Sequence, residues 1–372
     1  MLSVFSSPGH YVQGRDATAA LGPEMARLGL TGGPVLVVAA PSAERLLADI
    51  WRTTFKEVGT DHTVHRFGGE CSVAEVARIG QAAVTSGAAV IVGAGGGKAL
   101  DAARAAADDL DLPMVSCPTA ASNDAPCSAL SVLYTDDGAF ERYQLVRRNP
   151  ALVLVDSSAV VRAPARLFSA GMGDALATWF EARTCVTGRV RNMRGGASTT
   201  AAAALSELCH RTLLADGADA LSAVRQQVVT PAVERVIEAN TLLSGLGFES
   251  SGLAAAHAVH NGLTAVPQTH SYLHGEKVAF GVLTQLVLEG ARSSEIDEVL
   301  GFCRRVGLPV TLGGLGLAEA DRDTLERIAT RATAEGETIH NEPFAVDARM
   351  VADALAAADA LGRAFSPVGH PG

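Results

Sequence analysis

Up to about Val161 the chain alternates short apolar runs with helical patterns, and this alternation constrains the fold more than any other feature. The apolar runs are typical of buried strands and cover residues 34–39, 63–67, 89–93, 113–117 and 152–156. Helical patterns separate several of them, at residues 43–55, 73–86 and 98–110. Strand, helix, strand in this order predicts a parallel sheet with helices on its faces. Residues 131–145 interrupt the alternation, and Asp137-Gly138 within them predicts a hairpin turn.

After Val161 the strand signals stop and the pattern is mainly helical, as in residues 197–214 and 230–243. A chain of 372 residues exceeds what one hydrophobic core usually supports. We therefore predict two domains, an α/β domain over residues 1–162 and a helical domain over residues 163–372, with the boundary near Pro164. Residues 366–372 are typical of a frayed tail.

Composition excludes some functions. The net charge of -10 argues against non-specific nucleic-acid binding, which needs a basic surface. The alanine-rich segments carry too many charged residues to span a membrane, so no membrane partner is expected. The first residues lack the basic and apolar regions of a secretory signal. The six cysteines form no CxxC pair, which favours reduced thiols and a cytoplasmic protein.

A glycine-rich loop, Gly93-Ala-Gly-Gly-Gly-Lys98, follows a predicted strand and opens a helix. Glycines let a ligand approach the main chain, and the free amides of a helix start attract phosphate. The loop is no Walker A motif because Ala99 replaces the Ser or Thr that would hold magnesium. It is no GxGxxG motif either, because Lys98 occupies the third glycine position. The alternative is a plain glycine-rich turn with an exposed lysine.

The next predicted strand is followed by a polar segment, residues 118–130, which contains Asp124 and Ser128. Carboxyl ends of parallel strands share one edge of the sheet, where open α/β folds bind ligands. The segment therefore supplies hydroxyl groups and a carboxylate to that edge. An ordinary Asn/Asp/Pro turn is the alternative.

Four of the ten histidines, His257, His260, His270 and His274, lie between Ser251 and Gly281. Two imidazoles from successive helices could share one divalent cation. An aspartate with two histidines leaves an open position on such a cation for a substrate oxygen, and Asp174 at a predicted helix start is a candidate. The alternatives are core or capping histidines and an aspartate that only caps its helix.

Four long segments carry a family resemblance. They are GGGKALD, PTAASNDAPCSALSVLYTDDG, GMGDALATWFEA and the stretch from ESSGLAAAHAVHNG to HGEKVAFGVLTQLVL. They resemble bacterial glycerol dehydrogenases of the metal-dependent, iron-type alcohol dehydrogenase superfamily. The likeness covers nearly the whole chain, from SPGHYVQG near the start to AEGETIHN at residues 334–341.

The resemblance implies an N-terminal nucleotide-binding α/β domain and a C-terminal helical domain, with the active site in the cleft between them, as in dehydroquinate synthase-like folds. The family's metal ligands match Asp174, His257 and His274, which leaves His260 without a ligand role, and its substrate-contacting aspartate matches Asp124. Its cofactor contacts fall on the glycine loop and on the segments after it: Gly95, Gly96, Gly97, Lys98, Asp101, Thr119, Ser122, Ser128, Leu130 and Tyr134.

The resemblance also implies the reaction. It is the reversible, NAD-linked oxidation of glycerol or a related vicinal diol to a hydroxyketone such as dihydroxyacetone. The expected metal is Zn²⁺, with Fe²⁺ as the alternative, and the expected assembly is a homo-oligomer, often an octamer. Two departures matter. Relatives carry an acidic residue where this chain has Ala40, so NADP is an alternative cofactor, and relatives often carry Thr in place of Asn123.

Three other functions are alternatives. A dehydroquinate synthase-like lyase or cyclase would use NAD transiently and grip a substrate phosphate, yet residues 251–274 contain no Lys or Arg. A non-catalytic binding protein would be expected to lack a ligand, and all three are present. A polyol or alcohol dehydrogenase with another substrate remains open.

Overall fold

The structure is a computed structural model that describes residues 1–136, 138 and 140–365. By internal contacts the chain divides into two compact units. The sheet unit consists of Ser6–Phe168 and Ser222–Leu246, and the helical unit consists of Met1–Phe5, Ser169–Leu221 and Gly247–Gly372. Neither unit is one continuous segment of the chain. The division at residue 162 stays a prediction. The predicted tail, residues 366–372, lies outside the described residues.

The sheet unit contains a six-stranded sheet in the order β1-β8-β5-β4-β2-β3, and every neighbouring pair is parallel. Its strands are β1 (Tyr11–Gly14), β2 (Val35–Ala39), β3 (His62–Arg66), β4 (Val90–Gly95), β5 (Met114–Pro118) and β8 (Leu152–Asp156). β2, β4, β5 and β8 are buried along their whole length. Apolar residues that face both ways along these strands require cover on both faces. This confirms the predicted parallel α/β fold.

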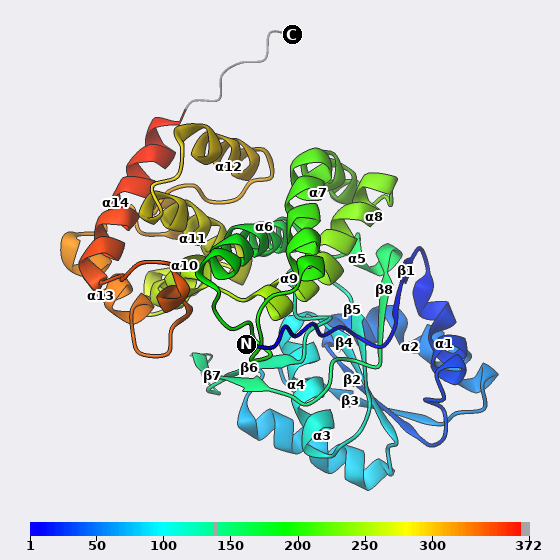
Figure 1. Ribbon diagram of the computed structural model, residues 1–372. Helices are drawn as coiled ribbons and strands as arrows, with labels where there is room; N and C mark the ends of the chain where they lie inside the picture. Colours follow the sequence, from blue (N-terminus) through cyan, green and yellow to red (C-terminus); the bar gives the residue numbers. More distant parts are fainter. Residues whose placement is uncertain (137, 139, 366–372) are drawn as a thin grey trace. The chain divides into compact units, whose positions relative to one another are not determined.

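Helices cover both faces of this sheet (Figure 1). On one face, α1 (Leu21–Arg27) and α2 (Pro41–Glu57) pack Leu21, Trp51 and Phe55 against Val35 and Val37. On the other face, α3 (Val73–Ser86) and α4 (Gly97–Asp109) pack against Leu36 and Val38. Alternate residues of β2 therefore enter opposite cores, as the period of two in a strand requires.

Two details of the sheet differ from the sequence prediction. The run at residues 63–67 was expected to be buried, but β3 is an edge strand in which two of its five residues, His62 and His65, are partly covered and the rest are exposed. A strand at the edge of a sheet is less covered than a central one, so the apolar residues of this run predicted more burial than β3 has. The four-residue β1 was not predicted at all, because its sequence YVQG has too few apolar residues to mark a strand.

The predicted hairpin is present as β6 (Leu130–Tyr134) paired antiparallel with β7 (Phe140–Leu145). Asp137 of its expected turn lies outside the described residues. Short elements complete the sheet unit: η1 (Ala17–Ala20), α5 (Ser157–Val160), α8 (Pro231–Glu238) and the π-helical segment η2 (Ala239–Leu243).

In the described part of the chain no strand follows β8. The longer helices are α6 (Ala165–Gly188), α7 (Thr200–Arg225), α9 (Ser244–Ser251), α10 (Ala255–Leu263), α11 (His274–Leu288), α12 (Ser293–Arg305), α13 (Arg322–Ala332) and α14 (Ala348–Ala364). Three single turns lie between them, η3 (Pro267–Thr269), η4 (Gly313–Leu315) and η5 (Thr338–Asn341). Among the described residues, none of these helices has the length and hydropathy needed to cross a bilayer.

Candidate metal centre and cofactor loops

Three side chains of the helical unit converge from three helices. Asp174 lies in α6, His257 in α10, and His274 is the first residue of α11. The Nε2 atoms of His257 and His274 lie 3.3 Å and 3.0 Å from the same Asp174 carboxylate oxygen, Oδ1. One ligand atom of each residue lies within 4.8 Å of the others. Asp174 is fully buried, His257 is nearly so, and the side chain of His274 remains 34% exposed.

Glycines explain how these helices come so close. A Cβ atom on Gly173 would overlap the carbonyl oxygen of Gly275, and one on Gly275 would overlap that of Ala170. A Cβ atom on Gly281 would likewise overlap the carbonyl oxygen of Ala256. At these points α11 therefore meets α6 and α10 main chain to main chain. Gly173 and Gly275 each adjoin a converging residue, and Ala256, the contact of Gly281, adjoins His257, so these contacts set the spacing of the cluster.

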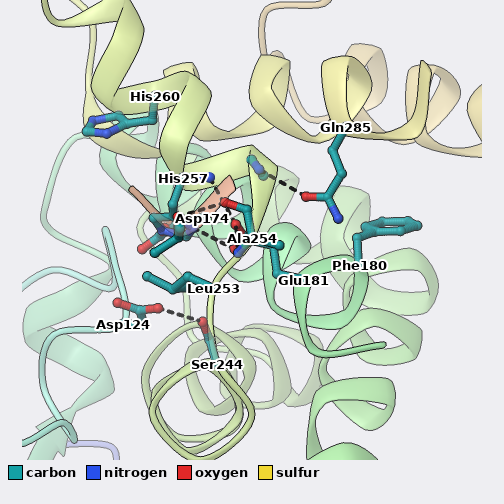
Figure 2. A network of polar contacts seen from close by, with 12 residues as sticks. Asp124, Asp174, Phe180, Glu181, Ser244, Leu253, Ala254, His257, His260 and Gln285 are labelled. Carbon is teal, nitrogen blue, oxygen red and sulfur yellow. Dashed lines mark hydrogen bonds and ion pairs between the residues drawn. The ribbon is translucent and has the colours of Figure 1, made fainter. Parts of the chain in front are cut away.

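Glu181 holds His257 from behind. It follows Asp174 by two helical turns on α6, is fully buried, and accepts hydrogen bonds from the main-chain amides of Ala254, at 2.8 Å, and of His257, at 3.0 Å. Its other oxygen lies 2.6 Å from Nδ1 of His257. Figure 2 shows this carboxylate directed toward His257 and Ala254. Because a carboxylate only accepts, Nδ1 carries a hydrogen, which leaves Nε2, on the Asp174 side, as the nitrogen that a metal can take.

The donor set fits a divalent transition metal. One carboxylate oxygen and two imidazole nitrogens are the ligands found in three-ligand zinc and iron sites. Burial disfavours ionised Asp174, but the two neighbouring imidazoles hold the pKa of this carboxyl well below its usual range. Burial also disfavours protonated His257, but Glu181 and Asp174 raise its pKa well above the usual value. The site therefore concentrates negative charge around imidazole nitrogens, which is an environment that attracts a cation.

His260 is not part of the converging set. It lies one turn beyond His257 on α10, and its Nε2 is 3.0 Å from Nδ1 of His274, on the side of that ring away from Asp174. Its own Nδ1 is 3.1 Å from the Oδ1 atom of Asn261. His270 is exposed, and its Nε2 lies 3.0 Å from the carbonyl oxygen of Thr264. Neither residue offers a nitrogen to the cluster.

A buried polar network continues behind Glu181. Gln285 accepts from the Ala256 amide at 2.9 Å (Figure 2). It also donates to Glu289 at 2.8 Å. Glu342 is buried close to this region. Burial, and next the nearby carboxylate of Glu289, raise the pKa of Glu342 to about 8. This carboxyl is therefore mainly protonated at neutral pH.

The glycine loop of the sheet unit has the expected position. Gly95 ends β4 with φ +156°, Gly96 is the N-cap of α4 without a side-chain cap, and Gly97 is the first helical residue. The side chain of Asn123 lies directly against Gly97 and would overlap a Cβ atom there. Asn123 thus contacts the start of α4, which brings the segment after β5 onto the glycine loop.

Two of the residues matched to cofactor contacts are held by neighbours. Lys98 forms an ion pair with Glu70 at 2.6 Å, and its ammonium group lies 4.9 Å from the centre of the Tyr134 ring. Asp101 is buried, with one carboxylate oxygen 2.5 Å from Arg104 and the other accepting from the Val132 amide at 3.1 Å. These contacts give Asp101 a structural part in joining α4 to β6, whatever it contributes to cofactor binding.

The remaining residues that match the family's cofactor contacts all follow β5 in the chain. The Thr119 amide donates to the Gly95 carbonyl oxygen at 3.0 Å, and the Ser128 hydroxyl, which is buried, is 3.5 Å from the Ala125 carbonyl oxygen. Ser122 is partly buried, and Leu130 opens β6. Asp124 accepts a hydrogen bond from Ser244 at 3.2 Å (Figure 2). Ser244 directly follows the π-helical segment η2, and such segments often accompany functional sites.

Ala40 ends the connection from β2 to α2. It is the N-cap of α2 without a side-chain hydrogen bond, and its Cβ would lie 2.9 Å from a Cβ on Gly95. The position where relatives were expected to carry an acid therefore borders the glycine loop. Arg45 on α2 is exposed, and Arg66 ends the neighbouring strand β3 beside Ala39. Arg66 is only loosely paired, at 3.8 Å from Glu44.

Sequence reasoning missed several residues that support this site. Glu181 carried a usable signal, since it lies seven residues after Asp174 and so on the same face of one helix. Gly173 and Gly275 also carried one, because each adjoins a candidate ligand. Asn261 and Ser244 carried none, because their roles depend on contacts between segments distant in sequence.

Comparisons with known proteins agree with this arrangement. The iron-containing alcohol dehydrogenase family matches residues 8–157. A glycerol dehydrogenase of Pseudomonas putida is 52% identical over 359 residues, which cover 96% of this chain and 98% of that protein. A glycolaldehyde reductase of Halobacterium salinarum is 48% identical over 363 residues, which cover 98% of this chain and 99% of that protein. The crystal structure of a probable glycerol dehydrogenase from Sinorhizobium meliloti 1021 superposes with a TM-score of 0.91 at 42% identity, covering 98% of this chain and 100% of that one. Similarity of this degree along nearly the whole chain makes this protein a member of the iron-containing alcohol dehydrogenase family.

Proposed function

We propose that this protein catalyses the reversible, NAD-linked oxidation of glycerol to dihydroxyacetone with the help of a bound divalent metal. The observation that carries the proposal is the convergence of Asp174, His257 and His274 within 4.8 Å, in a chain 52% identical to a glycerol dehydrogenase. Zn²⁺ is the metal that we favour, with Fe²⁺ as the alternative, because both accept a carboxylate and two imidazoles.

Asp174, His257 and His274 would hold the metal. When bound, such a metal supplies a Lewis acid that lowers the pKa of a substrate hydroxyl. Asp174 contributes the negative charge of the site from a fully buried position. Glu181 keeps the hydrogen of His257 on Nδ1, at 2.6 Å, so that Nε2 stays available. The exposed part of His274 marks the side from which a small molecule can approach.

The glycine loop and the segment after β5 would hold NAD. The free amides at the start of α4 suit a phosphate, and Lys98 adds a positive charge. Glycerol loses the proton of its central hydroxyl group and, from the carbon that bears this group, a hydride that passes to the nicotinamide ring. The products are dihydroxyacetone, the reduced cofactor and one proton. The hydride chemistry belongs to the cofactor, and the protein supplies position and charge.

Asp124 is proposed to accept a hydrogen bond from a second substrate hydroxyl. Its carboxylate already accepts from Ser244, which fixes its direction. Asp124 is partly buried, and an acceptor shielded from water that loses a partner costs free energy, so such a residue favours diols over simple alcohols.

A second candidate, glycolaldehyde reduction, is supported by the 48% identical glycolaldehyde reductase. Both reactions interconvert a hydroxyl and a carbonyl group beside another hydroxyl. The choice between them rests on substrate size, so both belong in the same assay.

The decisive experiment is a screen of polyols and hydroxyaldehydes with NAD and NADP, which follows the absorbance of the reduced nicotinamide. Glycerol should give the highest kcat/KM with NAD, chelation should abolish activity, and Zn²⁺ should restore it. Activity that survives complete metal removal, or a preference for glycolaldehyde over dihydroxyacetone, contradicts the proposal.

His274→Ala should lose both metal and activity while the fold is kept. Metal retention by His274→Ala together with its loss from His260→Ala would show that the wrong histidine was chosen.

We also propose a homo-oligomer in the cytoplasm. The oligomer rests on the family resemblance, and light scattering on the purified protein tests it. All six cysteines are buried free thiols, which supports a reducing compartment.

A further inference from the structure

A chain of hydrogen bonds leads away from His274 on the side opposite Asp174. Nδ1 of His274 lies 3.0 Å from Nε2 of His260, and Nδ1 of His260 lies 3.1 Å from Oδ1 of Asn261. Nδ2 of Asn261 donates to Glu337 at 2.9 Å, and the other oxygen of Glu337 pairs with Arg331. All five residues belong to the helical unit. His260 and Asn261 are 8% and 3% exposed, so water does not readily replace these contacts.

The direction of each hydrogen bond follows from the far end. The carboxylate of Glu337 only accepts, so the amide nitrogen of Asn261 faces it and the amide oxygen faces His260. That oxygen also only accepts, which places the hydrogen of His260 on Nδ1. Nε2 of neutral His260 is then an acceptor, and the nitrogen that faces it must donate.

The donor is Nδ1 of His274, because two bare nitrogens at 3.0 Å would leave a buried pair of acceptors without a hydrogen. With its hydrogen on Nδ1, His274 has Nε2, on the Asp174 side of the ring, as the nitrogen that a metal can take. This is the tautomer that a metal ligand needs. Glu181 achieves the same for His257 with one direct contact.

We propose that Glu337, Asn261 and His260 are positioning residues that fix the tautomer and the ring orientation of His274 for metal binding. The inference rests on the proposed metal site and extends it. It also gives His260 a part in the site, although His260 does not offer a nitrogen to the cluster.

The test compares substitutions of His260 by metal affinity rather than by activity. His260→Leu removes the acceptor and should weaken Zn²⁺ binding about tenfold to a hundredfold, the usual range for a lost hydrogen-bond partner of a ligand. His260→Gln places an amide oxygen near the position of Nε2 and should restore most of the affinity. His270→Leu, in the same segment but outside the chain of hydrogen bonds, serves as the matched control and should leave affinity unchanged.

Two further measurements keep the proposal testable if His260→Leu folds poorly. Asn261→Leu breaks the chain one step further out, without touching His274, and should also weaken Zn²⁺. The absorption spectrum of bound Co²⁺ should change in His260→Leu and Asn261→Leu but not in His270→Leu, since it reports how the ligands are oriented. Affinity is measured by competition with a chelator, and thermal unfolding of the metal-free variants checks the fold.

The outcomes separate the two proposals. If the wild-type protein does not bind one Zn²⁺ per chain, the proposed metal site is wrong and this inference falls with it. If the wild type binds Zn²⁺ and His260→Leu and Asn261→Leu bind it equally well, only the inference is overturned. An affinity for His260→Gln as low as that of His260→Leu also overturns it, because packing rather than hydrogen bonding would then explain the effect.

Discussion

Replacing Glu181 by glutamine tests the electrostatic design of the site with a change of one atom. The carboxylate accepts three hydrogen bonds, from the Ala254 amide at 2.8 Å, the His257 amide at 3.0 Å and Nδ1 of His257 at 2.6 Å. A glutamine has only one acceptor oxygen. In Glu181→Gln, either the amide NH₂ faces Nδ1 of His257 or it faces two main-chain N–H groups.

Both arrangements are costly. The first forces the hydrogen of His257 onto Nε2, where it blocks the lone pair that faces Asp174. In the second arrangement the glutamine NH₂ faces two main-chain N–H groups, so donors face donors. Each buried group left without a partner costs about 1–3 kcal/mol. Since about 1.4 kcal/mol is a factor of ten in a binding constant, we expect Zn²⁺ affinity to fall about tenfold to a hundredfold, and kcat at limiting metal to fall with it.

The measurement is chelator competition for Zn²⁺ with the purified variant. Glu335→Gln is the matched control, because Glu335 is an exposed carboxylate of the same helical unit. Wild-type affinity in Glu181→Gln would refute the reasoning, and so would an equal loss in the control. Thermal unfolding of the metal-free forms separates a damaged site from a damaged fold.

The pKa of Glu342, raised from 4.5 to about 8 by burial, means that the stability this group contributes is present below about pH 4.5 and is lost as pH rises through 8. Glu342→Gln should therefore flatten the fall of the unfolding temperature between about pH 4.5 and about pH 8, and an unchanged slope would contradict the assignment. Ala40→Asp should lower kcat/KM for NADP relative to NAD, because a carboxylate there repels a 2′-phosphate; a parent enzyme that already rejects NADP, with no change in the variant, would disprove the idea. Asp124→Ala should narrow the preference for glycerol over 2-propanol, and an unaltered ratio of their kcat/KM values would remove Asp124 from substrate selection.

Much of the sheet unit could be predicted because its elements are written in local sequence. α3 begins and ends where the periodicity placed it, at Val73 and Ser86, since Ser72 accepts from the Glu75 amide and Gly87 adopts φ +63°. The buried strands were found because a strand covered on both faces is apolar at every position. β1 was not predicted, because its pairing with β8, rather than its own composition, makes it a strand.

The candidate site could be predicted in part. The resemblance selected Asp174, His257 and His274, and the structure brings their ligand atoms together, while metal binding by them stays a prediction. The supporting residues were not predictable in the same way. Asn261 and Glu337 are 76 residues apart, and only the folded chain shows that they touch. Residues 222–246 belong to the sheet unit, although the segments before and after them belong to the helical unit. Local sequence patterns cannot predict this, because it depends on packing between distant segments.

The glycine contacts between α6, α10 and α11 have a consequence for how the protein is loaded with metal. Where helices touch main chain to main chain, no side chain can rearrange to bring them closer, so the ligand spacing is set by the fold before an ion arrives. The entropy cost of ordering the site is then part of folding. Metal binding does not have to order mobile segments, so its free energy is not reduced by that cost. We therefore expect the amides along α11 to exchange with deuterium as slowly in the metal-free protein as in the loaded one. Ions of unsuitable size would bind weakly, because the ligands cannot move to fit them. A newly made chain could also fold completely before it binds its metal.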